Sequence, residues 1–217
     1  MNAALAPRFE HGLQTAFGLR EEIERVCAEA RQEQYRAVIV PSSRVAEAYD
    51  AVEGTDVKVS CLIGFPLGWS DADAKRFEIE AAVDAGAHEI EYIPSLARLK
   101  EKEYRAVLRE IRDAENACDE RPLKVLVEVS LWTPPELEEI VKLVLDSGAR
   151  YLSSGFVGSA ETVSRLRELL GPKFGLKCDL PSLEMAELAL SAGADLISLA
   201  QLLRAGARNP AAETAPR

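Results

Sequence analysis

The stretch VKVSCLIGFPLGWSDADAKRFEIEAAVDAGAHEIEYI, residues 57–93, decides the fold. It opens with an apolar, β-branched run from residue 57 to 63, which the glycine- and proline-containing loop 64–68 closes. Residues 71–85 then follow the spacing of an amphipathic helix that Gly86 ends, and residues 88–93 form a second strand-like run before Pro94. A strand, a helix and a second strand in this order predict a unit with two parallel strands.

The same alternation continues on both sides of this unit. Further strands are predicted at residues 9–13, 37–40, 123–129, 150–154, 174–178 and 196–199, and further helices at 20–35, 44–53, 103–117, 134–146, 160–170 and 182–191. Eight strands separated by helices predict an α/β fold, a single-domain (β/α)₈ TIM barrel over residues 1–203. Residues 204–217, rich in Ala, Pro and Arg, are expected to form a disordered tail. A doubly wound sheet is the alternative, but the chain has no glycine fingerprint for phosphates.

Composition excludes several classes of function. The chain of 217 residues has 36 acidic and 26 basic residues, hence a net charge of −10, which argues against binding nucleic acid or an anionic membrane surface. Two histidines cannot supply the ligand sets of most zinc sites. The four cysteines form no C-x-x-C motif, and no apolar run has the length of a signal peptide or a membrane span. We expect a cytoplasmic protein without a metal or a cofactor.

Side-chain alternation places charged residues inside the predicted barrel. In the run 123–129, Val125, Val127 and Val129 form an all-apolar face that should meet the helices, so Lys124 and Glu128 should point inward. The same argument turns Glu89 and Glu91 inward on the fourth strand and Lys177 inward on the seventh. Buried charges are costly unless they are paired. The sequence therefore predicts either a structural network of ion pairs or a functional site in the barrel.

Position along the strands separates these residues. Glu91, Glu128 and Lys177 lie near the carboxyl ends of their strands, where barrels of this architecture keep their chemistry, whereas Glu89 and Lys124 lie nearer the starts. Desolvation lowers the pKa of an inward lysine and favours nucleophilic chemistry, but neighbouring glutamates favour the charged ammonium. The sequence leaves both outcomes open.

Several motifs resemble those of one enzyme family. They are the loop Ile63-Gly64-Phe65-Pro66-Leu67-Gly68, the segment Gly86-Ala87-His88-Glu89-Ile90-Glu91, the strand Leu123-Lys124-Val125-Leu126-Val127-Glu128, and Gly175-Leu176-Lys177. From about residue 10 to 203 the chain resembles the deoxyribose-phosphate aldolase family, whose members are class I aldolases on a (β/α)₈ barrel. The resemblance implies this fold and often a homodimer.

The resemblance also implies site residues. The family uses a Schiff-base lysine on the sixth strand, an aspartate on the fourth and a second lysine on the seventh; Glu91 and Lys177 match the last two positions. The sixth strand here, Tyr151-Leu152-Ser153-Ser154-Gly155-Phe156, has no lysine, and Ser153 or Ser154 takes the place of the nucleophile. A hydroxyl cannot form an imine, so the family's usual intermediate is not expected there.

The phosphate-binding turns of the family are altered as well. The glycine-rich turn after the seventh strand is replaced by Cys178-Asp179-Leu180-Pro181, and the turn after the eighth by Ser198-Leu199-Ala200-Gln201. Pro181 has no amide to donate, and Asp179 would repel a dianion. Deoxyribose 5-phosphate is therefore not the expected substrate.

Three hypotheses follow from these observations. The first is a diverged aldolase-type enzyme that acts on a small, non-phosphorylated carbonyl compound, with Lys177 as nucleophile or acid–base group and Glu91 as its partner. The second is an acid–base enzyme without an imine, such as an isomerase, a cyclase or a condensing enzyme. The third is a catalytically inactive barrel with a binding role. The candidate catalytic residues are Lys177, Glu91, Glu128, Lys124, Ser153 and Ser154.

Overall fold

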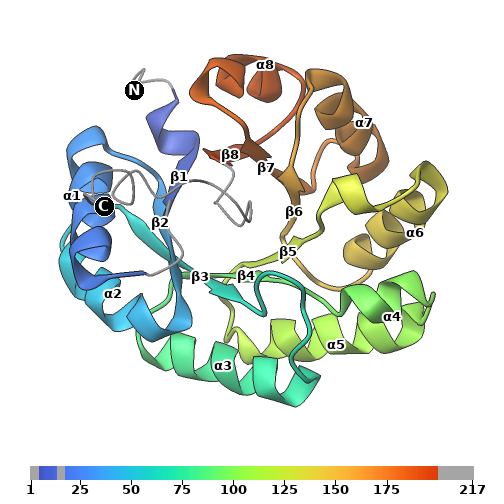
Figure 1. Cartoon of the computed structure of the whole chain (residues 1–217), viewed down its shortest axis with the longest axis horizontal. Helices are drawn as coiled ribbons and strands as arrows, with labels where there is room; N and C mark the ends of the chain where they lie inside the picture. The colour runs from blue at the N-terminus through green and yellow to red at the C-terminus, as the bar shows by residue number, and fades with distance from the viewer. Residues whose placement is uncertain (1–4, 14–17, 200–217) are drawn as a thin grey trace, which may run out of the picture.

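Eight parallel strands close into a barrel in the computed structural model, which describes residues 5–13 and 18–199 (Figure 1). Each strand pairs with its neighbours in chain order, and the last pairs with the first. The predicted (β/α)₈ barrel in a single domain is therefore confirmed. The strands are β1 (Phe9–Gly12), β2 (Ala37–Pro41), β3 (Lys58–Ile63), β4 (Glu89–Tyr92), β5 (Leu123–Leu126), β6 (Tyr151–Phe156), β7 (Gly175–Leu180) and β8 (Leu196–Leu199).

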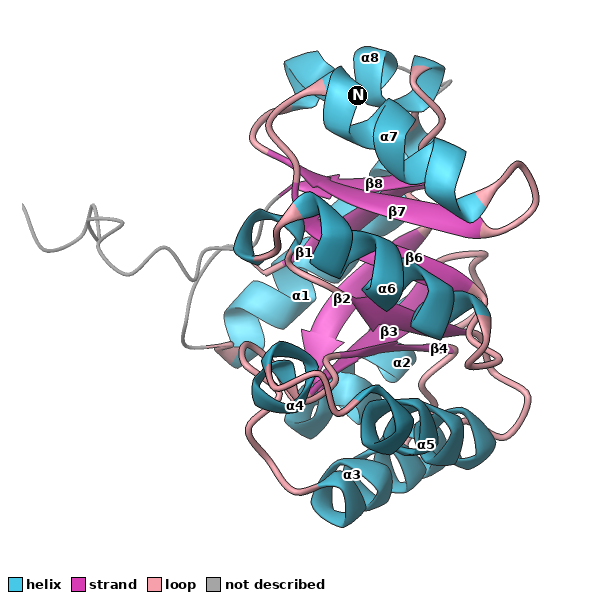
Figure 2. Ribbon diagram, turned by 90° about the vertical axis from the view of Figure 1, so that its right-hand side faces the viewer, coloured by secondary structure: helices cyan, strands magenta, loops and turns pink. Residues whose placement is uncertain are grey.

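Helices surround the barrel as an outer ring (Figures 1 and 2). They are α1 (Arg20–Glu33), α2 (Val45–Val52), α3 (Ala72–Asp84), α4 (Leu96–Lys100), α5 (Tyr104–Ala117), α6 (Pro134–Leu145), α7 (Ala160–Leu170) and α8 (Ala186–Ser191), with short 3₁₀ helices η1 (Ala6–Arg8), η2 (Ser42–Arg44), η3 (Val129–Leu131) and η4 (Leu183–Met185). The sequence did not predict α4, because five residues are too few to show helical periodicity.

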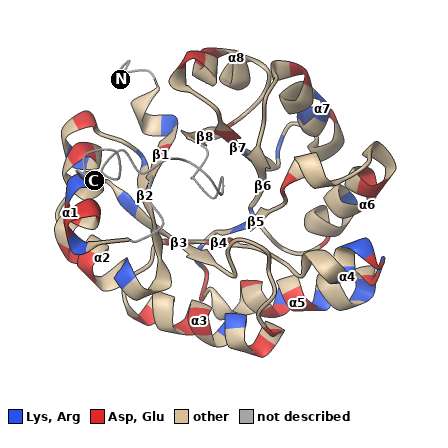
Figure 3. Ribbon diagram, viewed as in Figure 1, with Lys and Arg blue, Asp and Glu red and all other residues tan. Residues whose placement is uncertain are grey.

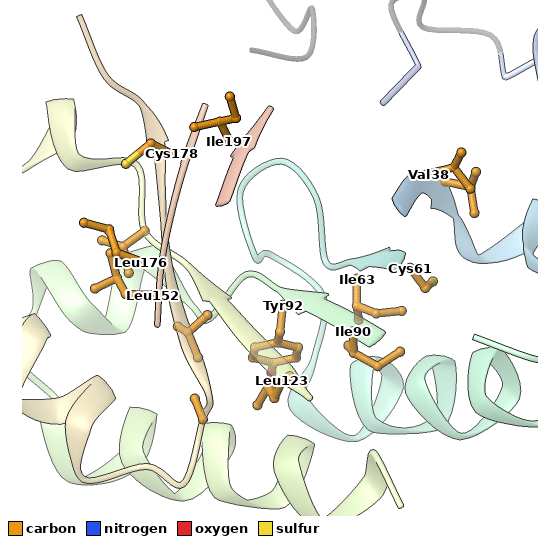
Figure 4. Close-up of a cluster of buried hydrophobic side chains, with 14 of the residues drawn as sticks. Val38, Cys61, Ile63, Ile90, Tyr92, Leu123, Leu152, Leu176, Cys178 and Ile197 are labelled. Carbon is orange, nitrogen blue, oxygen red and sulfur yellow. The ribbon is translucent and has the colours of Figure 1, made fainter. Parts of the chain in front are cut away.

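The hydrophobic core lies between the strands and the helices. Ile90, Leu152 and Leu176 point from their strands toward the helices and are fully buried there (Figure 4). For Ile90 and Leu176 this is the side opposite to the inward one predicted for Glu91 and Lys177. In β5 the valine parity also faces outward, since Val125 is fully buried in the same core. The alternate side chains of these strands therefore point into the barrel interior, where the charged residues lie.

Strand β5 is shorter than predicted. The expected strand 123–129 ends at Leu126, and Glu128 instead caps the 3₁₀ helix η3 with its carboxylate, which accepts the amide of Ser130. This local hydrogen bond competes with continuation of the strand. Glu128 is therefore a residue of the loop after the strand, not of the strand itself.

Two further observations concern the ends of the chain and its surface. The predicted tail at 204–217 lies outside the described residues. Within the described part of the chain, no helix is both long enough and apolar enough to cross a membrane. Acidic and basic side chains alternate over the outer helices, so the negative net charge is not gathered on one helix (Figure 3).

Candidate active site

The barrel interior holds a lower group of charged residues, which comprises Glu10, Arg36, Glu89 and Lys124. The Lys124 ammonium lies 2.7 Å from Glu10 Oε2 and 3.0 Å from Glu89 Oε2. Arg36 Nη1 donates to Glu89 Oε2 at 2.8 Å. All four come from the starts of their strands or from just before them. This lower group is a mutually neutralising set of four charges at the amino-terminal end of the barrel.

The pKa values in the lower group follow from this pairing. Burial opposes the charged form of Lys124, but Glu10 and Glu89 together hold its pKa above the ordinary value. Burial also opposes the charged form of Glu89, yet Lys124 and Arg36 lower its pKa to about 2. The network of structural ion pairs, one of the two alternatives that the sequence left open, is therefore present, and it includes the candidate residue Lys124.

An upper group lies toward the carboxyl ends of the strands and centres on Lys177 of β7. The Lys177 ammonium donates to Glu91 Oε1 at 2.8 Å, to Glu91 Oε2 at 3.0 Å and to Asp179 Oδ1 at 3.0 Å. Ser153 of β6 donates to Glu91 Oε1 at 2.5 Å, and Ser198 of β8 donates to Asp179 Oδ1. Four strands thus contribute to one hydrogen-bonded group, which we call the Lys177 cluster: Glu91, Ser153, Lys177, Asp179 and Ser198.

Lys177 is held as an ammonium ion. Its side chain is 1% exposed, and burial by itself lowers its pKa. The carboxylates of Asp179 and Glu91 act in the opposite direction and outweigh burial, so the pKa of Lys177 stands above its ordinary value. The sequence left open whether desolvation lowers the pKa of Lys177 or the carboxylates raise it; in the structure the carboxylates have the larger effect.

The two serine candidates of β6 have different surroundings. Ser153 is fully buried, points at Glu91 and lies 3.5 Å from the Lys177 ammonium. Ser154 has the opposite parity; its hydroxyl donates to the carbonyl of Gly155 and contacts Cys178. Ser153, and not Ser154, therefore lies beside the pair of Glu91 and Lys177.

A pocket of about 420 Å³ opens above the Lys177 cluster. Its polar residues include Glu91, Glu128, Lys177 and Asp179. Its apolar walls consist of Leu62, Phe65, Pro66, Leu67, Leu96, Leu126, Leu131 and Phe156. Among the described residues that line it, Lys177 is the one cation, against the three carboxylates of Glu91, Glu128 and Asp179. The pocket therefore combines an acidic floor with walls that suit a small carbon skeleton.

Glu128 stands at the side of this pocket and is half-buried. Its Oε1 accepts the hydroxyl of Ser130 at 2.6 Å, and its Oε2 accepts the amide of Phe156 at 3.1 Å. Gly155 has a φ of +63°, and a Cβ there would lie 2.6 Å from Glu128 Oε2. The carboxyl end of β6 thus packs closely against Glu128 and fixes its carboxylate at the pocket.

The structure brings together most of the candidates predicted from the sequence. Lys177, Glu91 and Glu128 line the pocket, and Ser153 supports it from below; Lys124 and Ser154 are not among its lining residues. Sequence reasoning missed Asp179 and Ser198 as members of the cluster. Asp179 is two residues after Lys177, and strand alternation, extended two residues further, would have turned it inward as well.

Two further features of the described residues concern metal-ligating side chains and the cysteine beside Lys177. In the described ranges, no group of three His, Cys, Asp or Glu side chains is placed to hold a metal ion. Cys178 follows Lys177 in sequence but lies in the outer core, and burial raises its pKa to about 12. A reactive thiolate at this position is therefore not supported.

Comparisons with known proteins agree with the geometry. No family model matches the chain. A curated deoxyribose-phosphate aldolase of a Geobacillus species is 34% identical over 205 residues, which covers 91% of this chain and 92% of that protein. The solved aldolase QR15 has a TM-score of 0.85 at 26% identity and covers 90% of this chain and 91% of its own. The tetrameric deoxyribose phosphate aldolase of Aeropyrum pernix has a TM-score of 0.82 at 28% identity, covering 91% and 87%. The chain belongs to the deoxyribose-phosphate aldolase family.

Proposed function

We propose that this chain is an aldolase-type enzyme that makes or breaks a carbon–carbon bond of a small, non-phosphorylated carbonyl compound. In this proposal Lys177 acts as an ammonium ion and Glu91 as its acid–base partner. The observation that carries it is the Lys177 cluster at the floor of the pocket, where two carboxylates keep the lysine charged. A protonated lysine is a proton donor and not a nucleophile.

The chemistry would run as an aldol cleavage without an imine. The Lys177 ammonium donates a hydrogen bond to the substrate carbonyl oxygen and stabilises the negative charge that develops there. A carboxylate, for which Glu91 is the best placed, takes the proton of the β-hydroxyl group. The carbon–carbon bond then breaks to give an aldehyde and an enolate, and the enolate carbon takes the proton back from Glu91, which gives the second carbonyl product and restores the carboxylate. The reverse sequence forms the bond.

The sixth-strand position supports a route without a covalent intermediate. Ser153 stands where the family resemblance places the Schiff-base lysine, and its hydroxyl is engaged with Glu91 at 2.5 Å. A serine hydroxyl lacks the amine that an imine needs. Its role in this proposal is to donate to Glu91 and orient the carboxylate toward the pocket.

The charge of the pocket supports a substrate without phosphate. The pocket has the three carboxylates of Glu91, Glu128 and Asp179 against one ammonium, so a phosphate dianion would be repelled by the net negative charge. Pro181, in the turn after β7, lacks the amide that a phosphate would use. Cleavage of deoxyribose 5-phosphate is therefore not part of this proposal.

The test compares 2-deoxyribose with 2-deoxyribose 5-phosphate, and then a panel of neutral hydroxy-aldehydes and hydroxy-ketones, by detection of the aldehyde released. We expect turnover of a neutral compound only, at least about a hundredfold loss in Lys177→Met and in Glu91→Gln, and no change in Lys142→Met, a matched change of an exposed lysine. Preferential turnover of the phosphate ester would overturn the substrate part of the proposal.

Borohydride separates the proposal from its alternatives. Activity that borohydride does not inhibit supports acid–base catalysis, whereas a carbonyl adduct trapped on Lys177 would establish imine chemistry instead. Binding without turnover of any carbonyl compound would favour an inactive barrel. The open pocket with its ordered polar floor counts against that third outcome, because Leu152 and Leu180 are buried in the outer core and do not fill it.

The assembly and location of the protein complete the proposal. We expect a homo-oligomer, as the Aeropyrum pernix relative is described as a tetramer, and light scattering after gel filtration gives the number of subunits. The four cysteines are buried and free, which supports a reducing compartment such as the cytoplasm. Cell fractionation tests this location.

A further inference from the structure

A buried polar cluster lies behind the apolar wall of the pocket and takes no part in the chemistry proposed above. It consists of Lys75 of α3, Tyr92 of β4 and Glu110 of α5. Lys75 is 0% exposed and Glu110 5% exposed, and none of the three lines the pocket. The Lys75 ammonium lies 2.6 Å from Glu110 Oε1 and 4.7 Å from the centre of the Tyr92 ring.

This cluster is bonded to the backbone of two separate loops. The Lys75 ammonium donates to the carbonyls of Gly68, at 3.4 Å, and Ile93, at 3.1 Å. Glu110 Oε1 accepts the amide of Ser95 at 3.1 Å and the hydroxyl of Tyr92 at 2.8 Å. Lys75 and Glu110 therefore tie the loop after β3, residues 64–71, to the loop after β4, residues 93–95.

The two loops also touch at their backbones. Gly68 has a φ of +64°, and a Cβ at this position would lie 2.1 Å from the carbonyl oxygen of Pro94. A Cβ at Gly64 would lie 2.8 Å from the side chain of Lys75. The two loops therefore approach too closely for a side chain at Gly64 or Gly68, and the polar cluster lies beside this contact.

These loops supply much of the apolar wall. Phe65, Pro66 and Leu67 come from the first loop, and Leu96 follows the second directly. Glu91 lies one residue before Tyr92, so the cluster is also anchored at the end of the strand that carries a floor carboxylate. A shift of either loop would change the width of the pocket over its floor.

We propose that Lys75 and Glu110 are positioning residues that fix the apolar wall and thereby set the affinity of the pocket for the carbon chain of its substrate. The inference rests on the proposed function in one respect, namely that this pocket is the site where the substrate binds. A merely structural role of the buried pair predicts a different result, namely a loss of stability spread over the whole barrel.

The experiment uses the double variant Lys75→Met/Glu110→Leu in the full chain. Replacing both members of a buried ion pair by apolar residues of similar volume leaves no unpaired charge, so the barrel is expected to fold. The variant loses the hydrogen bonds to Gly68, Ile93 and Ser95. We expect about tenfold faster hydrogen–deuterium exchange in residues 64–71 and 93–95 and wild-type exchange in the other strands. Exchange unchanged in both loops, or accelerated uniformly, would overturn the proposal.

The matched control is Arg76→Met/Glu80→Leu. This half-buried pair on α3 has its guanidinium 2.6 Å from the carboxylate, and the ion pairs of Arg76 are with residues of α3 itself. It should leave loop exchange unchanged. The variant Glu110→Gln provides a second test if the double variant does not fold. Its neutral amide is a weaker acceptor than the carboxylate and leaves the buried Lys75 ammonium without its counter-charge, so both loops should lose protection while the other strands keep it; unchanged loops in this variant would contradict the inference.

Kinetics give an independent measurement. With the best neutral carbonyl compound as the probe, the double variant should raise KM by about tenfold and leave kcat within about twofold, because the floor residues are untouched. A fall in kcat with unchanged KM would contradict the inference. If no carbonyl compound is turned over, the proposed function fails, and the exchange measurement alone still decides whether Lys75 and Glu110 hold the loops.

Discussion

Glu89 offers a test of whether the lower charged group stabilises the barrel without serving the pocket. The perturbation is Glu89→Gln, which keeps the shape of the side chain and removes its charge. Glu89 is 4% exposed, accepts from Arg36 and lies 3.0 Å from the Lys124 ammonium. The substitution therefore leaves two cations of the lower group with Glu10 as their main partner.

The magnitude follows from the pKa of Glu89. Lys124 and Arg36 outweigh burial and lower this pKa from its ordinary value of 4.5 to about 2. At about 1.4 kcal/mol for each pKa unit, the folded state gains about 3 kcal/mol from the ionised form. We expect Glu89→Gln to lower the free energy of unfolding by about that amount at pH 7.

The pH dependence has a definite sign. A carboxyl group whose pKa is depressed by folding binds fewer protons in the folded state than in the unfolded state between the two values. Its stabilising contribution is complete above its unfolded pKa and is lost as the pH falls toward about 2. The stability difference between wild type and Glu89→Gln should therefore be largest near neutral pH and shrink steadily below pH 4.5.

Urea unfolding followed by circular dichroism, at several pH values between 7 and 2, measures this difference. Glu24→Gln, a change of an exposed glutamate on α1, is the control and should be neutral throughout. A difference below about 1 kcal/mol at pH 7, or one that does not change with pH, would refute the reasoning. Turnover of the best carbonyl probe should survive in Glu89→Gln, since Glu89 does not line the pocket.

Three further outcomes are expected. Asp179→Asn removes a carboxylate that raises the pKa of Lys177, so turnover of the best carbonyl probe should begin to fall at a lower alkaline pH than in wild type; an unchanged pH profile would contradict this role. Gly68→Ala should lower the free energy of unfolding by about 2 kcal/mol or more, because its φ is positive and its Cβ would overlap the Pro94 carbonyl; a neutral result in urea unfolding would argue against the close loop contact. Burial raises the pKa values of the thiols of Cys27, Cys61, Cys118 and Cys178, so all four should resist Ellman's reagent at pH 8 until the protein is unfolded. A thiol that reacts rapidly in the folded protein would contradict this expectation.

Local patterns in the sequence were sufficient for the fold and for the faces of its strands. A strand places successive side chains on opposite sides, so the valines of the run 123–129 predicted the side that faces the helices and thereby placed Lys124 inside the barrel. The same alternation placed Glu89, Glu91 and Lys177 inside the barrel, where they are buried. The sequence also showed that the stretch 151–156 on β6 has no lysine, because the type of each residue can be read without any structure.

The grouping of the inward charges depended on the tertiary structure. Lys177 and Glu91 are 86 positions apart, and Lys124 and Glu10 are 114 apart, so no local pattern states which of them meet. The tilt and register of the closed barrel assign Lys124 and Glu89 to the lower group and Lys177, Glu91 and Asp179 to the floor of the pocket. The same holds for the charge of Lys177, because burial and nearby carboxylates act on its pKa in opposite directions, and only their distances decide which prevails.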